Sequence, residues 1–218
     1  MKLHSYWRSS CSWRVRIGLA HKGVSYEYVP VHLVRDGGEQ HAADYLALNG
    51  LAQVPTLTWR HDGERRVLTQ SLAILEWLEA ERPSPPLIPN DAFLAAQVRE
   101  QAEIVNAGIQ PLQNLAMLQK LKAEGADAKA FGREVITRGL AALERSVTSS
   151  GGAFCVGEQV TLADLCLIPQ LYNARRFEVE LSAFPRLLSV EASCAGLPAF
   201  IAAHPDKQPD APVPETDG

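Results

Sequence analysis

The sequence predicts an α/β domain followed by an all-helical domain. Strand and helix signals alternate through residues 1–82, four prolines interrupt the stretch 83–90, and helical periodicity dominates residues 91–218. Clustered prolines cannot continue a helix, so they favour a stiff connection. We therefore expect an N-terminal α/β domain at 1–82, a proline-rich linker at 83–90 and a helical domain at 91–218.

Composition narrows the class of protein. The 218 residues are 46% hydrophobic and 21% charged, which is typical of a globular protein with a real core. A net charge of −4 argues against a nucleic-acid partner. No apolar run approaches the ~20 residues of a membrane span, and the N-terminus has no apolar signal-peptide core. We expect a cytoplasmic protein without a membrane partner.

The four cysteines are scattered without metal-type spacing, so we expect free thiols, a reducing compartment and no metal site. Three of them, Cys155, Cys166 and Cys194, lie among apolar residues and are expected to be buried. The six histidines form no cluster, and we interpret them as structural or surface residues. Cys11 lies in a different environment, beside serines.

The first 31 residues predict a strand, a helix and a strand. Met1–Tyr6 is a short strand, and Cys11–Lys22 has a broad apolar face opposite basic residues, which is typical of a helix. Gly23 is a suitable residue to end that helix. Tyr26–Val31 is β-branched and aromatic, which favours a second strand.

Residues 32–82 predict a loop, a hairpin and a helix. The expected elements, in chain order, are a turn at Asp36–Gly38, a short helix at Asp44–Leu48, a strand at Val54–Trp59, a hairpin turn at His61–Glu64, a strand at Arg66–Leu68 and a helix at Leu72–Glu81. Ser71 is the expected N-cap of the last helix.

The remainder predicts helices at Ala92–Leu121, Ala128–Ser149 and Leu162–Arg175, with a short one after Pro185. Gly108 and Pro111 are expected to bend or divide the first of these. Thr161 and Asp164 form a capping box at the start of the third. The polar, proline-rich tail Asp206–Gly218 is expected to be frayed.

Three segments carry candidate chemistry, and the first is Arg8–Arg16. It places the hydroxyls of Ser9 and Ser10 and the thiol of Cys11 at a helix start, where unpaired N–H groups stabilise an anion. That anion is either the thiolate of Cys11 or that of a bound thiol cofactor. The alternative is that Ser9 or Ser10 only caps the helix.

The other two segments are Gln53-Val54-Pro55 and Gln70-Ser71. A proline opening a central strand is the place where thioredoxin-like folds use a cis peptide, which presents the backbone of Val54 to an extended peptide. Ser71 begins a helix and can receive a ligand carboxylate on its N–H and hydroxyl, or can act simply as a cap.

In this order, and followed by a proline linker and helices, these segments resemble the glutathione transferase superfamily, and the resemblance spans nearly the whole chain. The stretch Ser9–Ile17 resembles the signature of the zeta class, which includes maleylacetoacetate and maleylpyruvate isomerases. The resemblance continues through 51–57, 70–74, 108–114 and 161–167. It implies a thioredoxin-like N-terminal domain, a C-terminal helical bundle, glutathione as the cofactor and a homodimer.

The resemblance also implies roles for individual residues. Ser9, Ser10 and Cys11 would surround the glutathione sulfur. The peptide part of glutathione would be held by Gln40, Gln53, Val54, Gln70 and Ser71, while Gln110 and Asn114 would reach in from the helical domain. Two departures are Gly18, where alanine is usual, and Arg175, where an acidic residue is more usual, so the charge beside the substrate is in question.

The implied reaction turns a maleyl keto-diacid into its fumaryl isomer, in the breakdown of aromatic compounds. A thiolate adds to an alkene carbon, the bond rotates, and expulsion of the thiolate restores a trans alkene. A small dicarboxylate suits arginine, and the candidates are Arg8, beside the serines, and Arg176. We expect Cys11 to support the site rather than to act as the nucleophile.

The sequence also permits three other classes of function. A conjugating or dehalogenating glutathione transferase would use the same thiolate and release an adduct. A thiol or dehydroascorbate reductase would depend on Cys11, and a non-catalytic dimer scaffold would need a decayed Arg8–Ser10 segment. The sequence does not distinguish maleylpyruvate from maleylacetoacetate.

Overall fold

The structure, a computed structural model, describes residues 1–212. Its contacts form two compact units, one of Met1–Pro85 with the segment from Pro198 onward, the other of Pro86–Leu197. The expected division at 1–82, 83–90 and 91–218 differs in the place of the C-terminal segment. That segment packs on the first unit because α10 (Pro198–Ala203) lies against α1 (Ser10–His21).

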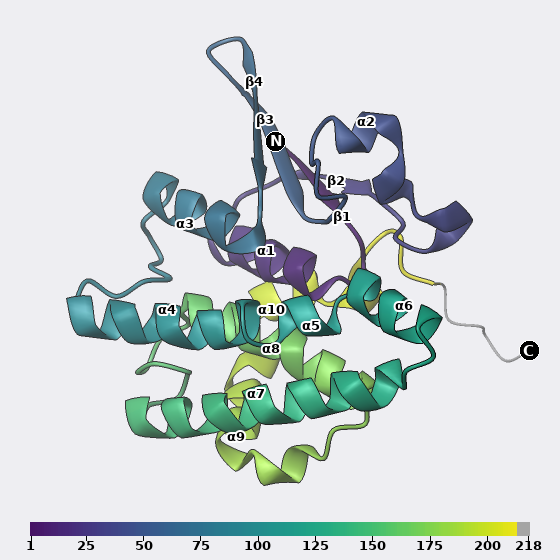
Figure 1. The fold of residues 1–218 in the computed structure, drawn as a ribbon. Coiled ribbons are helices and arrows are strands. Elements are labelled where there is room, and N and C mark those ends of the chain that lie inside the picture. The colour runs from purple at the N-terminus through teal and green to yellow at the C-terminus, as the bar shows by residue number, and fades with distance from the viewer. Residues whose placement is uncertain (213–218) are drawn as a thin grey trace, which may run out of the picture. The chain divides into compact units, whose positions relative to one another are not determined.

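The first unit contains a four-stranded mixed sheet with the strand order β2-β1-β3-β4 (Figure 1). Its strands are β1 (Lys2–Ser5), β2 (Glu27–Pro30), β3 (Thr56–His61) and β4 (Glu64–Thr69). β1 runs parallel to β2 and antiparallel to β3, and it pairs Leu3 with Leu57. Both leucines are fully buried, so the centre of the sheet is the core of this unit.

The predicted hairpin is confirmed by the pairing of β3 with β4. Its two central residues, Asp62 and Gly63, have φ values of 51° and 79°. Asp and Gly tolerate this left-handed backbone best, and a two-residue turn of this hand matches the twist of the strands.

The helices of the first unit are α1, α2 (Ala43–Leu46), α3 (Ser71–Glu81) and α10, with 3-10 turns at Arg35–Gly37, Glu39–His41 and Pro205–Lys207. Figure 1 shows α1 and α3 together on one side of the sheet. Gly23 follows α1 with φ of 63°, as the sequence predicts for a helix end. The expected cap of α3 is wrong by one residue, since Gln70 is the N-cap and Ser71 is the first helical residue.

The second unit is helical. It contains α4 (Ala92–Asn106), α5 (Gln110–Gln113), α6 (Leu115–Ala123), α7 (Ala128–Ser150), α8 (Leu162–Arg176), a 3-10 turn at Leu181–Ala183 and α9 (Pro185–Ala195). The predicted helix 92–121 is therefore three helices. The first break falls at Gly108, where a Cβ would lie 2.6 Å from the Ile104 carbonyl oxygen, and Pro111 lies in the first turn of α5, which follows. The second break falls at Asn114, which has an extended backbone and caps α6.

The predicted capping box at the start of α8 is confirmed. The carboxylate of Asp164 accepts hydrogen bonds from the Thr161 N–H at 2.7 Å and the Thr161 hydroxyl at 2.8 Å. It also accepts one from the Cys155 N–H at 2.8 Å. Asp164 is fully buried, so these three donors are what make its burial tolerable.

The expected fraying of Asp206–Gly218 is wrong for residues 206–212, and residues 213–218 lie outside the described part. Asp210 accepts hydrogen bonds from the Trp7 N–H at 3.0 Å and from the Tyr28 hydroxyl at 2.6 Å. A proline-rich, polar composition did not reveal these contacts, because they join positions far apart in the chain. Over residues 1–212, the helices lack the combination of length and apolar character that a membrane span needs.

Candidate active site

The start of α1 has the geometry of an anion-binding helix end. Ser9 is the N-cap, with an extended backbone, and its Oγ accepts a hydrogen bond from the Ser12 N–H at 3.2 Å. That hydroxyl is an acceptor in this contact, so its own proton remains available to a ligand. The first turn of α1 contains no acidic side chain, so the helix itself supplies no carboxylate that would compete with a bound anion.

The residues before Ser9 form a tight turn. The Ser9 N–H donates to the Tyr6 carbonyl oxygen at 3.0 Å, which closes the turn Tyr6–Ser9. The guanidinium of Arg8 lies over the Trp7 ring, 5.3 Å from the ring centroid, and Arg8 is half-buried. Arg8 is therefore held beside the serines with part of its surface open to solvent.

Ser10 and Cys11 form the first turn of α1. Ser10 is buried, and Cys11 is half-buried. Cys155, Cys166 and Cys194 are all buried, as predicted, and burial raises the pKa of the Cys155 and Cys194 thiols. Cys11 is thus the cysteine open to solvent and to a ligand.

Val54 presents a free stretch of backbone beside this turn. The Val54–Pro55 bond is cis, as predicted, and the Gln53 carbonyl accepts from the Asn49 amide at 2.8 Å and the Tyr45 hydroxyl at 2.5 Å. Within residues 1–212, the N–H and C=O of Val54 make no hydrogen bond. The Val54 side chain packs with Tyr6, which places this backbone next to the turn before α1.

Gln70 and Ser71 stand at the start of α3. Gln70 has φ of 69°, a left-handed conformation rare for a non-glycine residue, and it is exposed. Ser71 is buried, and its Oγ accepts a hydrogen bond from the fully buried Arg14 of α1 at 3.3 Å. The contact ties the start of α3 to α1 and brings a positive charge to Ser71.

Gln40 is buried in the loop between β2 and α2. Its Nε2 donates to the Leu33 carbonyl oxygen at 3.2 Å, while its Oε1 is buried without a partner among the described residues. Leu33 packs against the cluster of Tyr6 and Val54, so Gln40 lies close to the same backbone. An unpaired buried oxygen fits a site that receives a ligand donor such as the amine of a peptide.

The remaining candidates lie in the helical unit. Asn114 is the N-cap of α6 and accepts from the Met117 N–H at 2.9 Å, and Gln110 begins α5. Arg176 ends α8 and is exposed, with Nη1 3.4 Å from Asn173 Oδ1. Its neighbour Arg175 forms a bidentate ion pair with Glu191, with N···O distances of 2.6 and 2.5 Å. The positive charge that is unusual at position 175 is therefore paired with a carboxylate of the same protein.

The cluster of Tyr6, Val31, Tyr45 and Val54 joins Val54 to the turn before Ser9 and, through Leu33, to Gln40. Ser71 is tied to α1 separately, through Arg14. Sequence reasoning missed the residues that support these candidates. Arg14 donates a hydrogen bond to Ser71, and the side chains of Tyr45 and Asn49 donate to the Gln53 carbonyl. Gly38 has φ of 102°, and the Gln40 amide lies so close to it that a Cβ there would be 2.4 Å from Gln40 Nε2. The only signal for Gly38 was its membership of a glycine turn.

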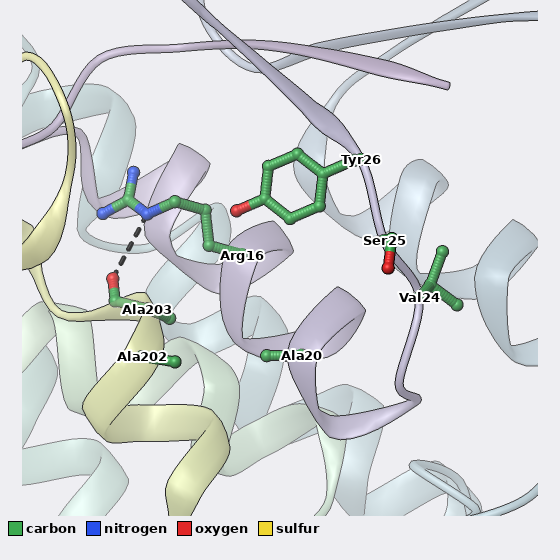
Figure 2. A pocket seen from close by; sticks show the side chains of 7 residues that line it. All are labelled: Arg16, Ala20, Val24, Ser25, Tyr26, Ala202 and Ala203. Atoms are coloured by element: carbon green, nitrogen blue, oxygen red, sulfur yellow. Dashed lines mark hydrogen bonds between the residues drawn. The ribbon is translucent and has the colours of Figure 1, made fainter.

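The first unit also contains a cavity away from these residues. A surface cavity of about 290 Å³ in the first unit is lined by Arg16, Ala20, Val24, Ser25, Tyr26, Ala202 and Ala203, none of them a candidate residue (Figure 2). Within residues 1–212, no group of three or more His, Cys, Asp or Glu side chains is placed to hold a metal ion.

Comparison with known proteins identifies the family. Residues 8–81 match the model of the glutathione S-transferase N-terminal domain, and residues 110–204 match that of the C-terminal domain. The chain belongs to the glutathione S-transferase family. The predicted combination of a thioredoxin-like domain with a helical domain is confirmed by these matches.

Individual relatives locate the chain within the glutathione S-transferases. It is 46% identical to the maleylacetoacetate isomerase of Mus musculus, over 97% of this chain and 95% of that one. It is 50% identical to the maleylacetoacetate isomerase of Anaeromyxobacter dehalogenans 2CP-1, solved with bound glutathione, with a TM-score of 0.90 and 97% of each chain covered. A maleylpyruvate isomerase described as a zeta-class glutathione S-transferase is 42% identical, with a TM-score of 0.90 over 97% of this chain and 100% of that one. The resemblance to the zeta class is confirmed.

Proposed function

We propose that this protein is a glutathione-dependent cis–trans isomerase that converts maleylpyruvate or maleylacetoacetate into the fumaryl isomer, in the breakdown of aromatic compounds. The observation that carries the proposal is the Ser9 cap of α1, whose hydroxyl proton is available at a helix end free of acidic side chains. It occurs in a chain 42–50% identical to proteins named for these two isomerisations.

Glutathione supplies the thiolate, which adds to one alkene carbon and leaves it again after the bond has rotated. The role of this chain is to keep that thiol ionised. Lowering a thiol pKa by two units takes about 2.7 kcal/mol. The end of α1 contributes roughly 0.3–2 kcal/mol, and a hydrogen bond from Ser9 to the charged sulfur roughly 1.5–3 kcal/mol. Their sum, roughly 1.8–5 kcal/mol, spans the amount needed, so no protein base is required.

Ser10 and Cys11 complete the surroundings of the sulfur in this proposal. Both are in the first turn of α1, where backbone N–H groups have no helical partner. Cys11 acts as a neighbour of the sulfur rather than as the nucleophile, because glutathione already supplies one. The absence of a nearby second solvent-accessible cysteine among residues 1–212 also disfavours a disulfide mechanism.

The peptide part of glutathione is assigned to the unpaired groups of the first unit. The free N–H and C=O of Val54 are assigned to hydrogen bonds with the extended backbone of the bound peptide. Gln53, the preceding residue, is assigned to the same part of the ligand. The start of α3 at Gln70 and Ser71 suits a carboxylate, supported by the charge of Arg14, and the unpaired Gln40 Oε1 suits an N–H donor. Gln110 and Asn114 are assigned to the same ligand from the helical unit.

The two carboxylates of the substrate are assigned to Arg8 and Arg176. Arginine is permanently charged and pairs with carboxylates in a fixed fork geometry. Arg8 is fixed over Trp7 next to the serines, so it can stabilise negative charge that develops on the keto-diacid. Arg175 is not assigned to substrate, because Glu191 occupies its guanidinium.

We further propose that the enzyme is a cytoplasmic homodimer. Four free cysteines suit a reducing compartment rich in glutathione. In the first unit, β4 is an edge strand on which Val67 is 40% exposed, and in the helical unit Phe93 of α4 is 70% exposed. Such apolar side chains suit burial against a second copy, and sedimentation equilibrium at micromolar concentration would measure the mass.

The proposed reaction is tested by following maleylpyruvate and, separately, maleylacetoacetate by NMR, with and without glutathione. We expect fumaryl product only when glutathione is present, with the glutathione signals unchanged at the end. The ratio of the two rates identifies the preferred substrate. Loss of glutathione to a stable adduct, without fumaryl product, would instead identify a conjugating transferase.

A further inference from the structure

The peptide backbone of Trp7 is held on both sides by residues distant in sequence. Its N–H donates to Asp210 Oδ2 at 3.0 Å, and its carbonyl oxygen accepts from Arg16 Nη2 at 2.8 Å. Trp7 is the second residue of the turn Tyr6–Ser9, which leads into the helix start. The two contacts therefore fix the turn from which Arg8 and Ser9 project.

Arg16 is fully buried and acts as a hub of hydrogen bonds. Besides Trp7, its guanidinium donates to the Tyr6 carbonyl at 3.3 Å, to the Ser5 hydroxyl at 3.1 Å and to the Ala203 carbonyl at 3.2 Å. The last of these bonds is visible in Figure 2, where the guanidinium reaches toward the end of α10. One side chain of α1 thus holds β1, the turn and the C-terminal segment together.

Asp210 holds the other side of the turn. Its carboxylate accepts from the Trp7 N–H through one oxygen and from the Tyr28 hydroxyl of β2 at 2.6 Å through the other. Burial lowers the pKa of Arg16 to about 10, and Tyr28, Tyr26 and Asp210 oppose that shift. A pKa of about 10 leaves Arg16 a cation at neutral pH, so it remains a strong donor to the turn.

Hydrogen bonds define the position of the buried guanidinium. Arg16 also borders the cavity of about 290 Å³, whose other walls are mostly small or apolar side chains, and the Tyr26 hydroxyl points toward the Arg16 side chain (Figure 2). Small and apolar neighbours offer a guanidinium no replacement acceptor, so its contacts with the turn are costly to lose.

We propose that Arg16 and Asp210 are positioning residues of the glutathione site, which hold the turn Tyr6–Ser9 so that Ser9 and Arg8 are aimed at the bound thiolate. This rests on the proposed function. The C-terminal segment is accordingly part of the active-site support and not a dispensable tail. Active sites need such support because small displacements of a charge-stabilising donor weaken its effect strongly.

The test replaces Asp210 and measures glutathione binding to the full-length protein. Calorimetry gives the affinity, and ultraviolet absorbance of the bound thiolate as a function of pH gives the pKa of the bound thiol. For Asp210→Ala we expect about tenfold weaker binding at pH values where the bound thiol is ionised, with the pKa of the bound thiol raised by about one unit, since a tenfold loss confined to the thiolate form equals one pH unit. Asp210→Asn retains an acceptor oxygen and should lose less.

Controls separate positioning from other effects. Asp206→Asn removes a negative charge from the same segment, but the Asp206 side chain is exposed and does not contact Trp7. This variant should bind glutathione as tightly as the wild type. Tyr28→Phe removes one hydrogen bond to Asp210 without removing the carboxylate, and should shift binding in the same direction by less. If Asp210→Ala does not fold, Tyr28→Phe takes its place as the test of the positioning role.

Three outcomes would overturn the inference. If the wild type does not bind glutathione, the proposed function itself is wrong. If the wild type binds while Asp210→Ala and Tyr28→Phe bind equally well with the same thiol pKa, only the positioning role is wrong. If Asp210→Ala and Asp210→Asn lower the thiol pKa equally, Asp210 acts as a simple negative charge and not through the turn.

Discussion

Gln113 and Gln170 join α5 to α8 through a reciprocal pair of side-chain amides. Gln113 Nε2 donates to Gln170 Oε1 at 2.6 Å, and Gln170 Nε2 donates to Gln113 Oε1 at 3.1 Å. Both side chains are buried. The pair fixes the short helix α5, which begins at Gln110 and is followed directly by Asn114, the two residues proposed to reach glutathione from the helical unit.

Breaking this pair on one side should destabilise the protein. Gln170→Leu leaves the amide of Gln113 buried without a partner, which costs about 1–3 kcal/mol of unfolding free energy. Gln113→Leu combined with Gln170→Leu should recover part of that loss, because no polar group is then stranded. Urea unfolding of the single and double variants measures both effects.

The matched control is Gln119→Leu, at an exposed position of α6, which should change the unfolding free energy by less than about 0.5 kcal/mol. If the double variant is as unstable as the sum of its two singles, the amides do not act as a pair.

The hydroxyl of Ser9 can be separated from its role as a helix cap. Ser9→Ala should cost about 1 kcal/mol of stability, whereas Ser9→Gly should cost only a few tenths, because glycine is itself an acceptable N-cap. Both variants lose the donor to the sulfur, so both should lose about 10²–10³-fold in isomerase kcat. Steady-state kinetics beside thermal unfolding gives the comparison, with Ser12→Ala as a control for a neighbouring buried serine. Activity that falls in Ser9→Ala and survives in Ser9→Gly would assign Ser9 to capping alone.

Much of this site was predictable from local sequence, and the rest depended on distant partners. The Ser9 cap and the Thr161 capping box are read from a few adjacent residues, because caps are local properties. The cis Val54–Pro55 bond was expected from the likeness to thioredoxin-like folds and not from the local residues, since only about 5% of X-Pro bonds are cis. The contacts of Asp210 with Trp7 and Tyr28 join residues up to 203 positions apart. No periodicity or turn signal reports such a contact, so the tail was wrongly expected to fray.

The same distinction explains the error at Ser71. A serine before an apolar helix is a good N-cap by propensity, yet Gln70 takes the cap with φ of 69° and Ser71 enters the helix. The Ser71 hydroxyl is engaged instead by the buried Arg14 from another helix. Tertiary contacts of this kind override local preference, and they are common where a ligand site is assembled.

Stability should fall as the pH is lowered through the range in which His4 is titrated in the unfolded chain. Burial, followed by the charges of Arg65 and Lys2, lowers the pKa of His4 in the fold below 6.5. A depressed histidine pKa favours the neutral form in the native state, so its contribution is present above pH 6.5 and is lost as the pH falls toward the native-state pKa. Because His4 is only half-buried, the slope should stay well below the about 1.4 kcal/mol per pH unit of a fully buried group.

His4→Leu removes this titration. Urea unfolding at several pH values between 7 and 5 should show a flatter dependence for the variant than for the wild type, since an unfolded-state proton is no longer taken up at this position. Leucine also suits the site because His4 Nε2 is buried without a hydrogen-bond partner among the described residues. Identical slopes for the two proteins would show that His4 does not contribute.

Cys11 provides the test that separates an isomerase from a reductase. It is half-buried at the start of α1, while the other three cysteines are buried, with the pKa of the Cys155 and Cys194 thiols raised by burial. A thiol reagent should therefore label one cysteine in the native protein and four after unfolding, and Cys11→Ala should abolish the native labelling. The same variant should keep isomerase activity within about tenfold of wild type, since the reacting sulfur belongs to glutathione.

Dehydroascorbate reduction, if the wild type shows any, should vanish in Cys11→Ala, because that reaction needs a protein thiol. A Cys11→Ala protein that loses isomerase activity by several orders of magnitude, while its unfolding free energy is unchanged, would instead make Cys11 the nucleophile.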